Sequence, residues 1–259
     1  MQKQLQSALA SLPLAAHRYF DTIGSTNDEA LAWATEDAGD LSLVVAESQT
    51  TGRGRAGRKW ITPSGSALAF SLILRPKAEE AVTASLFTGL GALALVEALK
   101  KRGLQPQIKW PNDVLVNGKK VAGILVESVW TGDALDTVVL GMGVNVLEGS
   151  NPPDAELLFP ATNVEAETGT APKRSVLLRD ILTALIEWRK KIPTGELVKA
   201  WEKYLAFHGE QVDIWKENEE PLTGRVLGLD PDGSLRLLSA RDGRIMTVQF
   251  GEIHLRPAV

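Results

Sequence analysis

The feature that most constrains the fold of this chain is a hairpin signal in its middle. Asn117-Gly118 separates two strand-like segments, residues 113–116 and 119–129. Both turn residues tolerate positive φ, which the two-residue turns of antiparallel hairpins require. Another apolar run follows at residues 137–149. The pattern therefore predicts neighbouring strands joined by tight turns, in an antiparallel or mixed sheet.

Further segments surround this hairpin. Apolar runs predict two more strands at residues 41–47 and 66–74. Helical patterns are expected in four segments, 27–34, 79–100, 175–191 and 194–207. Thr26 is the expected N-cap of the first helix. Gly89 and Gly91 in the second helix would allow it to pack closely on a sheet.

The hydrophobic pattern changes near residue 208. From Gly209 onward, five short segments alternate apolar and polar residues, and turn sequences such as Asp232-Gly233 separate them. Five short strands in about 50 residues are typical of a small SH3-like barrel. We therefore predict an α+β protein with two domains, residues 1–207 and 208–259.

Composition excludes several classes of protein. The chain of 259 residues has no Cys, so disulfides, thiolate metal sites and cysteine nucleophiles are excluded. Its formal net charge of -4 gives no general attraction to nucleic acid or anionic lipid. No segment approaches the ~18 apolar residues of a membrane-spanning helix. We therefore expect a cytoplasmic protein without a membrane partner.

Positive charge is concentrated in one glycine-rich region. Residues 48–78 hold six Lys and Arg and no acid, so they carry +6 while the rest of the chain carries -10. Residues 52–57 match G-x-G-x-x-G, but the segment after them cannot open a helix, which excludes a dinucleotide-binding fold. A P-loop is excluded because Gly57 is not followed by Lys and Ser or Thr. The glycines would let the backbone approach a ligand, and the arginines could bind phosphate or carboxylate. The alternative is a solvated loop, or a nucleic-acid contact in which Trp60 stacks on a base.

A second compact motif, Lys-Trp-Pro-Asn-Asp at residues 109–113, leads into the hairpin. Pro111 removes a backbone donor, and the two residues after it favour a turn. Lys119 and Lys120 then precede a nearly apolar segment. A buried ammonium needs an anionic partner, so we predict an anion near these lysines. The alternative is that both lysines only keep the hairpin solvated.

Together these motifs resemble the ordered signature of the biotin protein ligases. The resemblance rests on residues 25–27, 49–60, 109–113, 120–127 and 141–145, and the ending at residues 251–256 resembles the close of that family's small C-terminal domain. It implies the biotin/lipoate ligase fold, which is similar to class II synthetases. It also implies a two-step reaction, in which biotin and ATP form biotinyl-5′-AMP and a carrier-protein lysine then accepts the biotin.

The resemblance implies roles for particular residues. Lys120, Arg53 and Arg55 are the predicted catalytic cations, because two reacting anions repel each other unless positive charge lies between them. The predicted biotin-binding residues are Ser25, Thr26, Asn27, Gln49, Gly52, Arg53, Gly54, Arg55, Lys120 and Gly123. The predicted ATP-binding residues are Arg55, Arg58, Lys59, Trp60, Asn112 and Asn145. Asp113 is the expected Mg²⁺ contact, with capping of the turn beside Pro111 as its alternative role.

Partners follow from the same resemblance. The expected partner is a biotin carboxyl carrier domain of acetyl-CoA carboxylase or a related carboxylase. Ser25 lies about two dozen residues from the start, so we expect no helix-turn-helix domain and no DNA partner. The expected assembly is a monomer or homodimer. Two alternatives stay open: a lipoate–protein ligase, and a non-catalytic RNA-binding protein that uses the basic loop and the small barrel.

Overall fold

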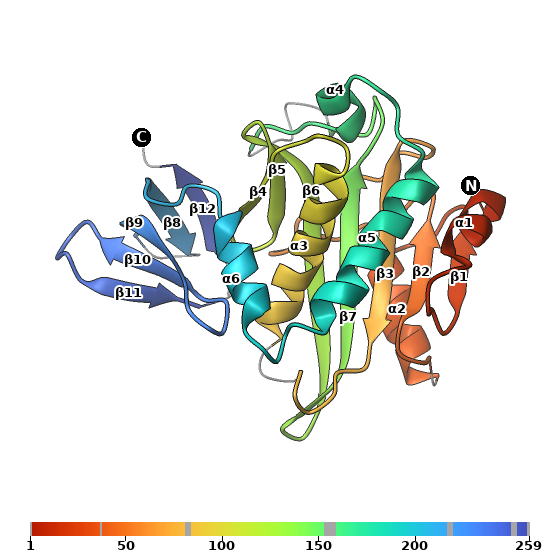
Figure 1. The fold of residues 1–259 in the computed structure, drawn as a ribbon, viewed down its shortest axis with the longest axis horizontal. Helices are drawn as coiled ribbons and strands as arrows, with labels where there is room; N and C mark the ends of the chain where they lie inside the picture. The colour runs from red at the N-terminus through yellow and green to blue at the C-terminus, as the bar shows by residue number, and fades with distance from the viewer. Residues whose placement is uncertain are drawn as a thin grey trace.

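The computed structural model describes residues 2–36, 38–80, 84–152, 159–216, 220–249 and 253–257. Two sheets organise the described chain, a seven-stranded mixed sheet and a five-stranded antiparallel sheet beside it (Figure 1). The fold is therefore α+β, as the sequence predicts. None of the described helices combines the length and the apolar character needed to cross a bilayer.

The larger sheet has the strand order β1-β2-β3-β7-β6-β5-β4. Only the pair β1–β2 is parallel; the other neighbours are antiparallel. Its strands are β1 (His17–Phe20), β2 (Ser42–Ala46), β3 (Ala67–Leu74), β4 (Pro106–Lys109), β5 (Asp113–Val116), β6 (Lys119–Thr131) and β7 (Ala134–Asn145). The predicted hairpin is confirmed, because Asn117 and Gly118 join β5 to β6 with φ values of 50° and 72°.

Helices cover both faces of this sheet. On one face lie α3 (Ser85–Lys100), α5 (Arg174–Arg189) and α6 (Glu196–Lys203), whereas α2 (Thr26–Thr35) packs on the other (Figure 1). The short helices α1 (Gln2–Leu9) and α4 (Val164–Thr168) lie at the periphery. Helix α3 is apolar nearly all round because it lies between the sheet and the two other helices.

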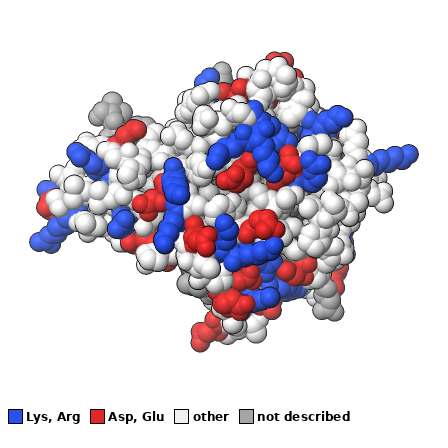
Figure 2. Space-filling model, in the orientation of Figure 1, with Lys and Arg blue, Asp and Glu red and all other residues white. Residues whose placement is uncertain are grey.

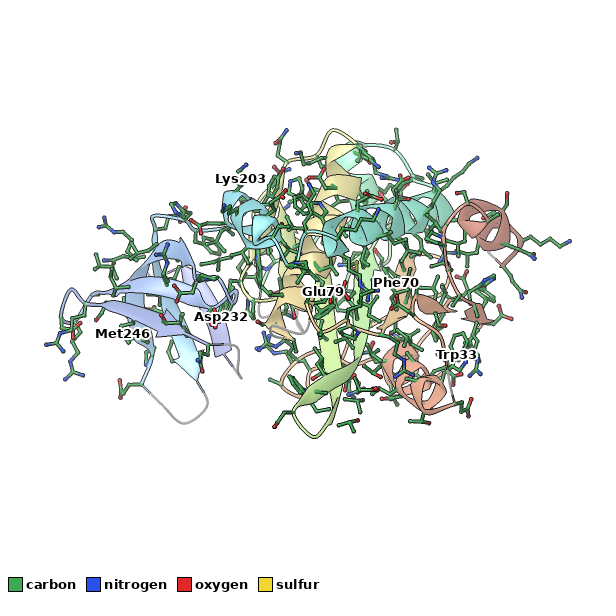
Figure 3. All side chains as sticks on the ribbon, turned by 60° about the horizontal axis from the view of Figure 1, so that its bottom comes forward. Trp33, Phe70, Glu79, Lys203, Asp232 and Met246 are labelled. Atoms are coloured by element: carbon green, nitrogen blue, oxygen red, sulfur yellow. The ribbon has the colours of Figure 1, made fainter. Side chains whose placement is uncertain are left out.

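Strand alternation assigns the residues of β3 and β7 to different layers. Phe70 of β3 packs in the main core, while Trp33 of α2 belongs to a second cluster on the opposite face (Figure 3). In β7, Leu140 and Met142 face the main core, whereas Gly141 and Gly143 face the α2 side. Because the two glycines have no side chains, groups from other elements can approach the backbone of β7 on that face.

The second sheet has the order β11-β10-β9-β8-β12. Its strands are β8 (Gln211–Lys216), β9 (Leu222–Leu229), β10 (Leu235–Ser239), β11 (Ile245–Val248) and β12 (Ile253–Pro257). All five predicted strands are present. Closure into an SH3-like barrel stays a prediction, because no pairing joins β11 to β12 among the described residues.

A turn of the second sheet docks against the first. The backbone oxygen of Gly233 accepts a 3.0 Å hydrogen bond from the buried indole of Trp110, and that of Asp232 accepts one of 2.6 Å from the Ser85 hydroxyl. Asp232 lies where the two sheets meet (Figure 3). One apolar core also runs through both parts of the chain. The division into domains at residues 207 and 208 therefore stays a prediction.

Several local predictions differ from the structure. Thr26 is not the N-cap of α2: Ser25 has extended backbone angles and its hydroxyl accepts from the Asp28 amide, which frees Thr26 for other contacts. Helix α3 begins at Ser85 rather than at residue 79, and α6 ends at Lys203 rather than at 207. Gly91 does pack on the sheet, against β6 and β7, but a Cβ at Gly89 would overlap the Trp201 ring of α6.

Candidate functional site

A cavity of about 730 Å³ lies on the α2 side of the larger sheet. Its walls come from the start of α2, the loop between β2 and β3, the turn before β5, and strands β6 and β7. Most of the predicted site residues line it, namely Ser25, Thr26, Asn27, Gln49, Arg53, Gly54, Arg55, Arg58, Lys59, Trp60, Asn112, Asp113, Lys120 and Gly123. Motifs far apart in the sequence therefore meet around one space.

Glycines form the floor of this cavity. A Cβ at Gly141 would overlap the Asn27 amide, and one at Gly143 would overlap the Trp60 indole. Gly123, the cross-strand partner of Gly143, is in ordinary contact with Trp60 and Lys120 at 3.4 Å from the position a Cβ would take. The backbone of β6 and β7 therefore comes within reach of flat groups lying on it.

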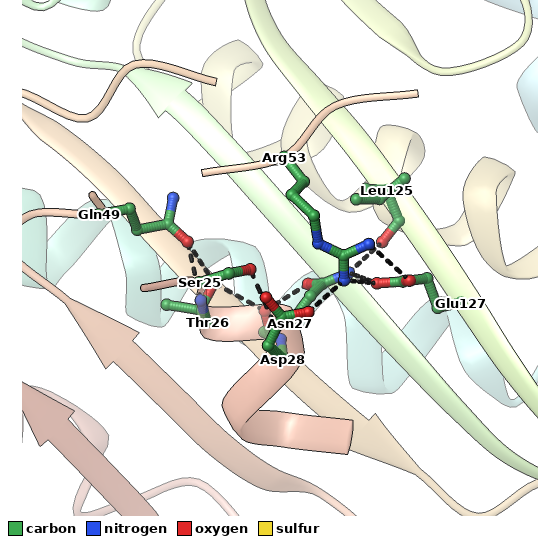
Figure 4. A network of polar contacts seen from close by, with 9 residues as sticks. Ser25, Thr26, Asn27, Asp28, Gln49, Arg53, Leu125 and Glu127 are labelled. Carbon is green, nitrogen blue, oxygen red and sulfur yellow. Dashed lines mark hydrogen bonds and ion pairs between the residues drawn. The ribbon is translucent and has the colours of Figure 1, made fainter. Parts of the chain in front are cut away.

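One end of the cavity is lined by uncharged polar groups from the start of α2 (Figure 4). The Gln49 side-chain oxygen accepts from the Thr26 amide at 2.8 Å and from its hydroxyl at 3.1 Å. The hydroxyl of Ser71, buried in β3, donates to Asn27 Oδ1 at 2.6 Å. Gln49 Nε2 in turn donates to Thr62 at 3.0 Å. These contacts hold amide and hydroxyl groups in fixed orientations at the cavity wall.

The same end carries an ion-pair cluster that sequence reasoning missed. Arg53 donates to both oxygens of Glu127, at 2.9 and 2.7 Å, and to Asp28 at 2.6 Å. Glu127 also accepts from Asn27 Nδ2 at 2.7 Å (Figure 4). These hydrogen bonds to Glu127 raise the pKa of Arg53 further above its ordinary value, although burial opposes the shift. In this arrangement Arg53 faces protein carboxylates.

The other end of the cavity is cationic. Asp113 lies 2.6 Å from the ammonium of Lys120 and 3.5 Å from that of Lys109. Burial alone would raise the pKa of Asp113, but the two ammonium groups outweigh it and the pKa is lowered. Burial lowers the pKa of Lys109, against the attraction of Asp113. The three groups together carry one net positive charge, which suits an anionic ligand.

The Mg²⁺ contact predicted for Asp113 stays a prediction. Its two oxygens each contact an ammonium group, at 2.6 and 3.5 Å, so a cation bound there would compete with Lys109 and Lys120 for the carboxylate. Among the described residues, no cluster of three or more His, Asp or Glu is placed to hold a metal ion. The chemistry of the donor set favours a role in holding Lys109 and Lys120.

The basic segment folds back on itself above the cavity. We call residues 48–60 the arginine loop. Within it Gly54 N donates to Arg58 O at 2.7 Å and Trp60 N donates to Gly52 O at 2.9 Å, so the segment forms a small hairpin. Ala56 and Gly57 take positive φ at its tip. At the cavity wall, the Arg55 guanidinium lies 3.4 Å from the side-chain oxygen of Asn112.

Glu47 anchors the base of this loop. It is buried at the end of β2, where it accepts from Arg174 at 2.8 and 3.2 Å, from the Tyr19 hydroxyl at 3.1 Å and from the Gly65 amide at 3.2 Å. Burial favours a raised pKa of Glu47, but Arg174 and the other donors lower it below its ordinary value. The ends of the segment are thereby tied to β1 and α5.

Two predicted residues lie outside the cavity wall. Asn145 is buried at the end of β7, where its amide donates to Thr162 O at 3.1 Å. Gly52 is buried inside the loop, where a Cβ would overlap the Trp60 carbonyl. Contacts of either residue with a ligand stay predictions.

The C-terminal segment that resembles the family's ending, residues 251–256, lies partly outside the described residues, and its side chains are not described.

The missed residues had weak sequence signals. Ser71 is the one polar side chain in the otherwise apolar strand of residues 67–74, and this could have marked it. Glu127 ends the motif of residues 120–127, yet its partners lie 74 and 100 residues away. No local pattern reveals such a pairing.

Comparison with known proteins gives this site its context. The sequence model of the biotin/lipoate A/B protein ligase family matches residues 19–145. The bifunctional ligase/repressor BirA of Bacillus spizizenii is 36% identical over 92% of this chain and 73% of its own length. The biotin--[acetyl-CoA-carboxylase] ligase of Paracoccus denitrificans is 37% identical over 82% of this chain and 90% of its own length.

Solved structures share the fold. The biotin protein ligase of Aquifex aeolicus, in complex with biotin and ATP, superposes with a TM-score of 0.81. It is 29% identical and covers 95% of this chain and 100% of its own. The sequence relatives, the shared fold and the succession of motifs around the cavity all indicate the same family. The chain belongs to the biotin protein ligase family.

Proposed function

We propose that this protein joins biotin to a lysine of a carrier domain, through a biotinyl-5′-AMP intermediate made from ATP. The observation that carries the proposal is the cavity itself. Its floor is glycine, one end holds oriented amides and hydroxyls, and the other end holds two ammonium groups. Named relatives are biotin--[acetyl-CoA-carboxylase] ligases, and a similar solved structure holds biotin and ATP.

The polar end matches the ureido group of biotin, which has one carbonyl acceptor and two N–H donors. Ser25, Thr26, Asn27 and Gln49 offer both hydroxyl and amide partners there. A ligand that extends from this end along β6 would bring its carboxylate toward Lys120, beside Gly123. Such a ligand would have both its ends recognised, which fixes the reacting oxygen in place.

In the first step a carboxylate oxygen of biotin attacks the α-phosphorus of ATP. A P–O bond forms, the bond to the β-phosphate oxygen breaks, and pyrophosphate leaves. Both reactants are anions, so positive charge near the junction stabilises the transition state. Lys120 is held by Asp113 for this task, and Lys109 adds a second ammonium.

Nucleotide binding is proposed for Arg55, Arg58, Lys59, Trp60 and Asn112, which line the cavity near its cationic end. The indole Nε1 of Trp60 is buried and has no hydrogen-bond partner among the described residues. A ligand acceptor would satisfy it. Mg²⁺ would enter as part of the substrate MgATP, and its contact with Asp113, directly or through water, stays a proposal.

In the second step the carrier lysine attacks the carbonyl carbon of the mixed anhydride. An amide bond forms, the acyl–phosphate bond breaks, AMP leaves, and the amine gives up a proton. No covalent enzyme intermediate is needed, which suits a chain without Cys. The proposed carrier is the biotin domain of acetyl-CoA carboxylase or a related carboxylase, and the proposed location is the cytoplasm.

Biotin-dependent exchange of labelled pyrophosphate into ATP tests the first step. The expected result is exchange that requires biotin, followed by an avidin-detectable product when an apo carrier domain is added. Exchange driven by lipoate and not by biotin would assign the protein to the lipoate branch instead. Figure 2 shows basic and acidic side chains interspersed on the face of α3 and α5, which lies opposite the arginine loop.

A further inference from the structure

Glu127 is a charged residue at the cavity that the proposed chemistry does not use. It lies in β6, and each of its carboxylate oxygens is bonded to Arg53, one of them to Asn27 as well. Arg53 belongs to the arginine loop and Asn27 to α2. One carboxylate on the sheet therefore joins two separate walls of the cavity (Figure 4).

This pairing separates Arg53 from the cationic end. The Lys120 ammonium lies beside Gly123, and four residues of strand, about 13 Å, separate Gly123 from Glu127. Arg53 and its two carboxylate partners together carry one net negative charge. An anion would therefore be attracted to Lys120 rather than to Arg53 in this arrangement.

The same carboxylate fixes the orientation of the Asn27 amide. Its Nδ2 donates to Glu127 at 2.7 Å and to Leu125 O at 3.3 Å, while its Oδ1 accepts from Ser71 at 2.6 Å. A reversed amide would put an oxygen against the carboxylate and against a backbone oxygen, so both contacts would be repulsive. Asn27 is also held against Gly141. Its amide therefore has one stable direction.

We infer that Glu127 is a positioning residue that closes the arginine loop over the cavity through Arg53 and orients Asn27 toward the ligand. The inference rests on the proposed function only for its effect on biotin binding. The closure itself concerns contacts within this chain. Bidentate pairing of a guanidinium with a carboxylate gives a defined geometry as well as attraction, which suits a latch.

Limited trypsin digestion of the ligand-free protein tests the latch directly. The loop offers cleavage sites at Arg53, Arg55, Arg58 and Lys59, which become accessible when the loop opens. Glu127→Ala should raise the cleavage rate in the loop about tenfold, and Glu127→Gln, which keeps an acceptor without the charge, by less. Asp133→Ala, which removes an exposed carboxylate from the turn after β6, is the matched control and should behave as the parent.

A double variant tests whether Glu127 acts through Arg53. Arg53→Ala also removes the contact with Asp28, so it should raise cleavage at the remaining sites by at least the factor seen in Glu127→Ala. Adding Glu127→Ala to Arg53→Ala should give no further increase. Effects that multiply in the double variant would overturn the inference. So would an unchanged cleavage rate in Glu127→Ala, provided that its thermal midpoint shows a folded protein.

Kinetics distinguish positioning from general loss of structure. In biotin-dependent pyrophosphate exchange, Glu127→Ala should raise the KM for biotin about tenfold and leave the KM for ATP within about twofold. Partial recovery is expected in Glu127→Gln. An equal loss for both substrates would overturn the orienting role. If the parent protein shows no exchange at all, the proposed function fails, while the digestion result still decides the latch.

Discussion

Asp113 and Lys120 face each other across the β5–β6 pair, with the carboxylate 2.6 Å from the ammonium. Lys109 approaches the same carboxylate from the end of β4. The pairing reduces two positive charges to one and fixes both lysines beside the cavity. Each partner of this group therefore has a different expected effect when it is removed.

Lys120→Ala should lose adenylation and keep the fold. In the proposed reaction the ammonium stabilises charge in the transition state, and removal of such a group costs about 10²-fold in rate. Asp113 keeps Lys109 as a partner, so the midpoint of unfolding should change little. Lys119→Ala is the matched control, because Lys119 is the exposed neighbour on the same hairpin. Near-parental pyrophosphate exchange in Lys120→Ala would refute the role.

Asp113→Asn should destabilise the protein. The substitution leaves two close ammonium groups without their counter-charge in a buried site, and breaking a buried ion pair costs about 3 kcal/mol. Urea unfolding measures the loss. Adding Lys109→Met removes the repulsion, so the double variant should recover part of the stability. If the single variant unfolds at the parental urea concentration, Asp113 does not hold the lysines as described.

Glu47 should contribute to stability in a pH-dependent way. Its pKa is lowered in the folded protein, so its contribution is present above the ordinary glutamate pKa of about 4.3 and is lost as pH falls through the lower folded value. Glu47→Gln should therefore be less stable than the parent at pH 7, and the difference should shrink in acid. Thermal midpoints between pH 7 and 3 measure it, with Glu148→Gln, an exposed carboxylate, as control. A difference that grows toward low pH would contradict the assignment.

Gly143→Ala should displace the arginine loop. Its Cβ would overlap the Trp60 indole, so the ring must move away from the floor. Overpacking of this kind costs about 1–3 kcal/mol, and the KM for biotin should rise with faster tryptic cleavage of the loop. Gly123→Ala, on the neighbouring strand, meets Trp60 and Lys120 at an ordinary 3.4 Å and should have a smaller effect. Equal effects of the two substitutions would argue against Trp60 resting on Gly143.

Local sequence patterns predict much of the fold. The Asn117-Gly118 turn and the five C-terminal strands depend on residues close in sequence, and the structure contains all of them. Strand β1 was not predicted, since it has only four residues and pairs in parallel with β2. Helix α3 begins at Ser85, whereas the sequence pattern predicts its start at residue 79. In the structure Glu80 bonds the Lys77 amide and the Arg189 guanidinium instead.

The motifs predict which residues lie at the cavity, but they do not predict which side chains pair with each other there. The motifs indicate Lys120 and Gln49, and both line the cavity. Nothing in the sequence around Arg53 shows that its guanidinium meets Glu127, because that contact depends on how the loop lies over β6. The sequence likewise does not show that the Asp113 carboxylate lies between two ammonium groups, because Lys109 and Lys120 reach it from different strands.

Substitutions on the two faces of strand β7 should have different consequences. On one face Leu140 and Met142 fill a packed core, so any change of volume there is felt as altered stability. On the other face Gly141 and Gly143 carry no side chain and lie directly under the Asn27 amide and the Trp60 indole, so any added atom displaces these two groups at the cavity. Ligand preference and thermal robustness can therefore be varied on alternate residues of a single strand, which makes β7 a natural starting point for altering one without the other.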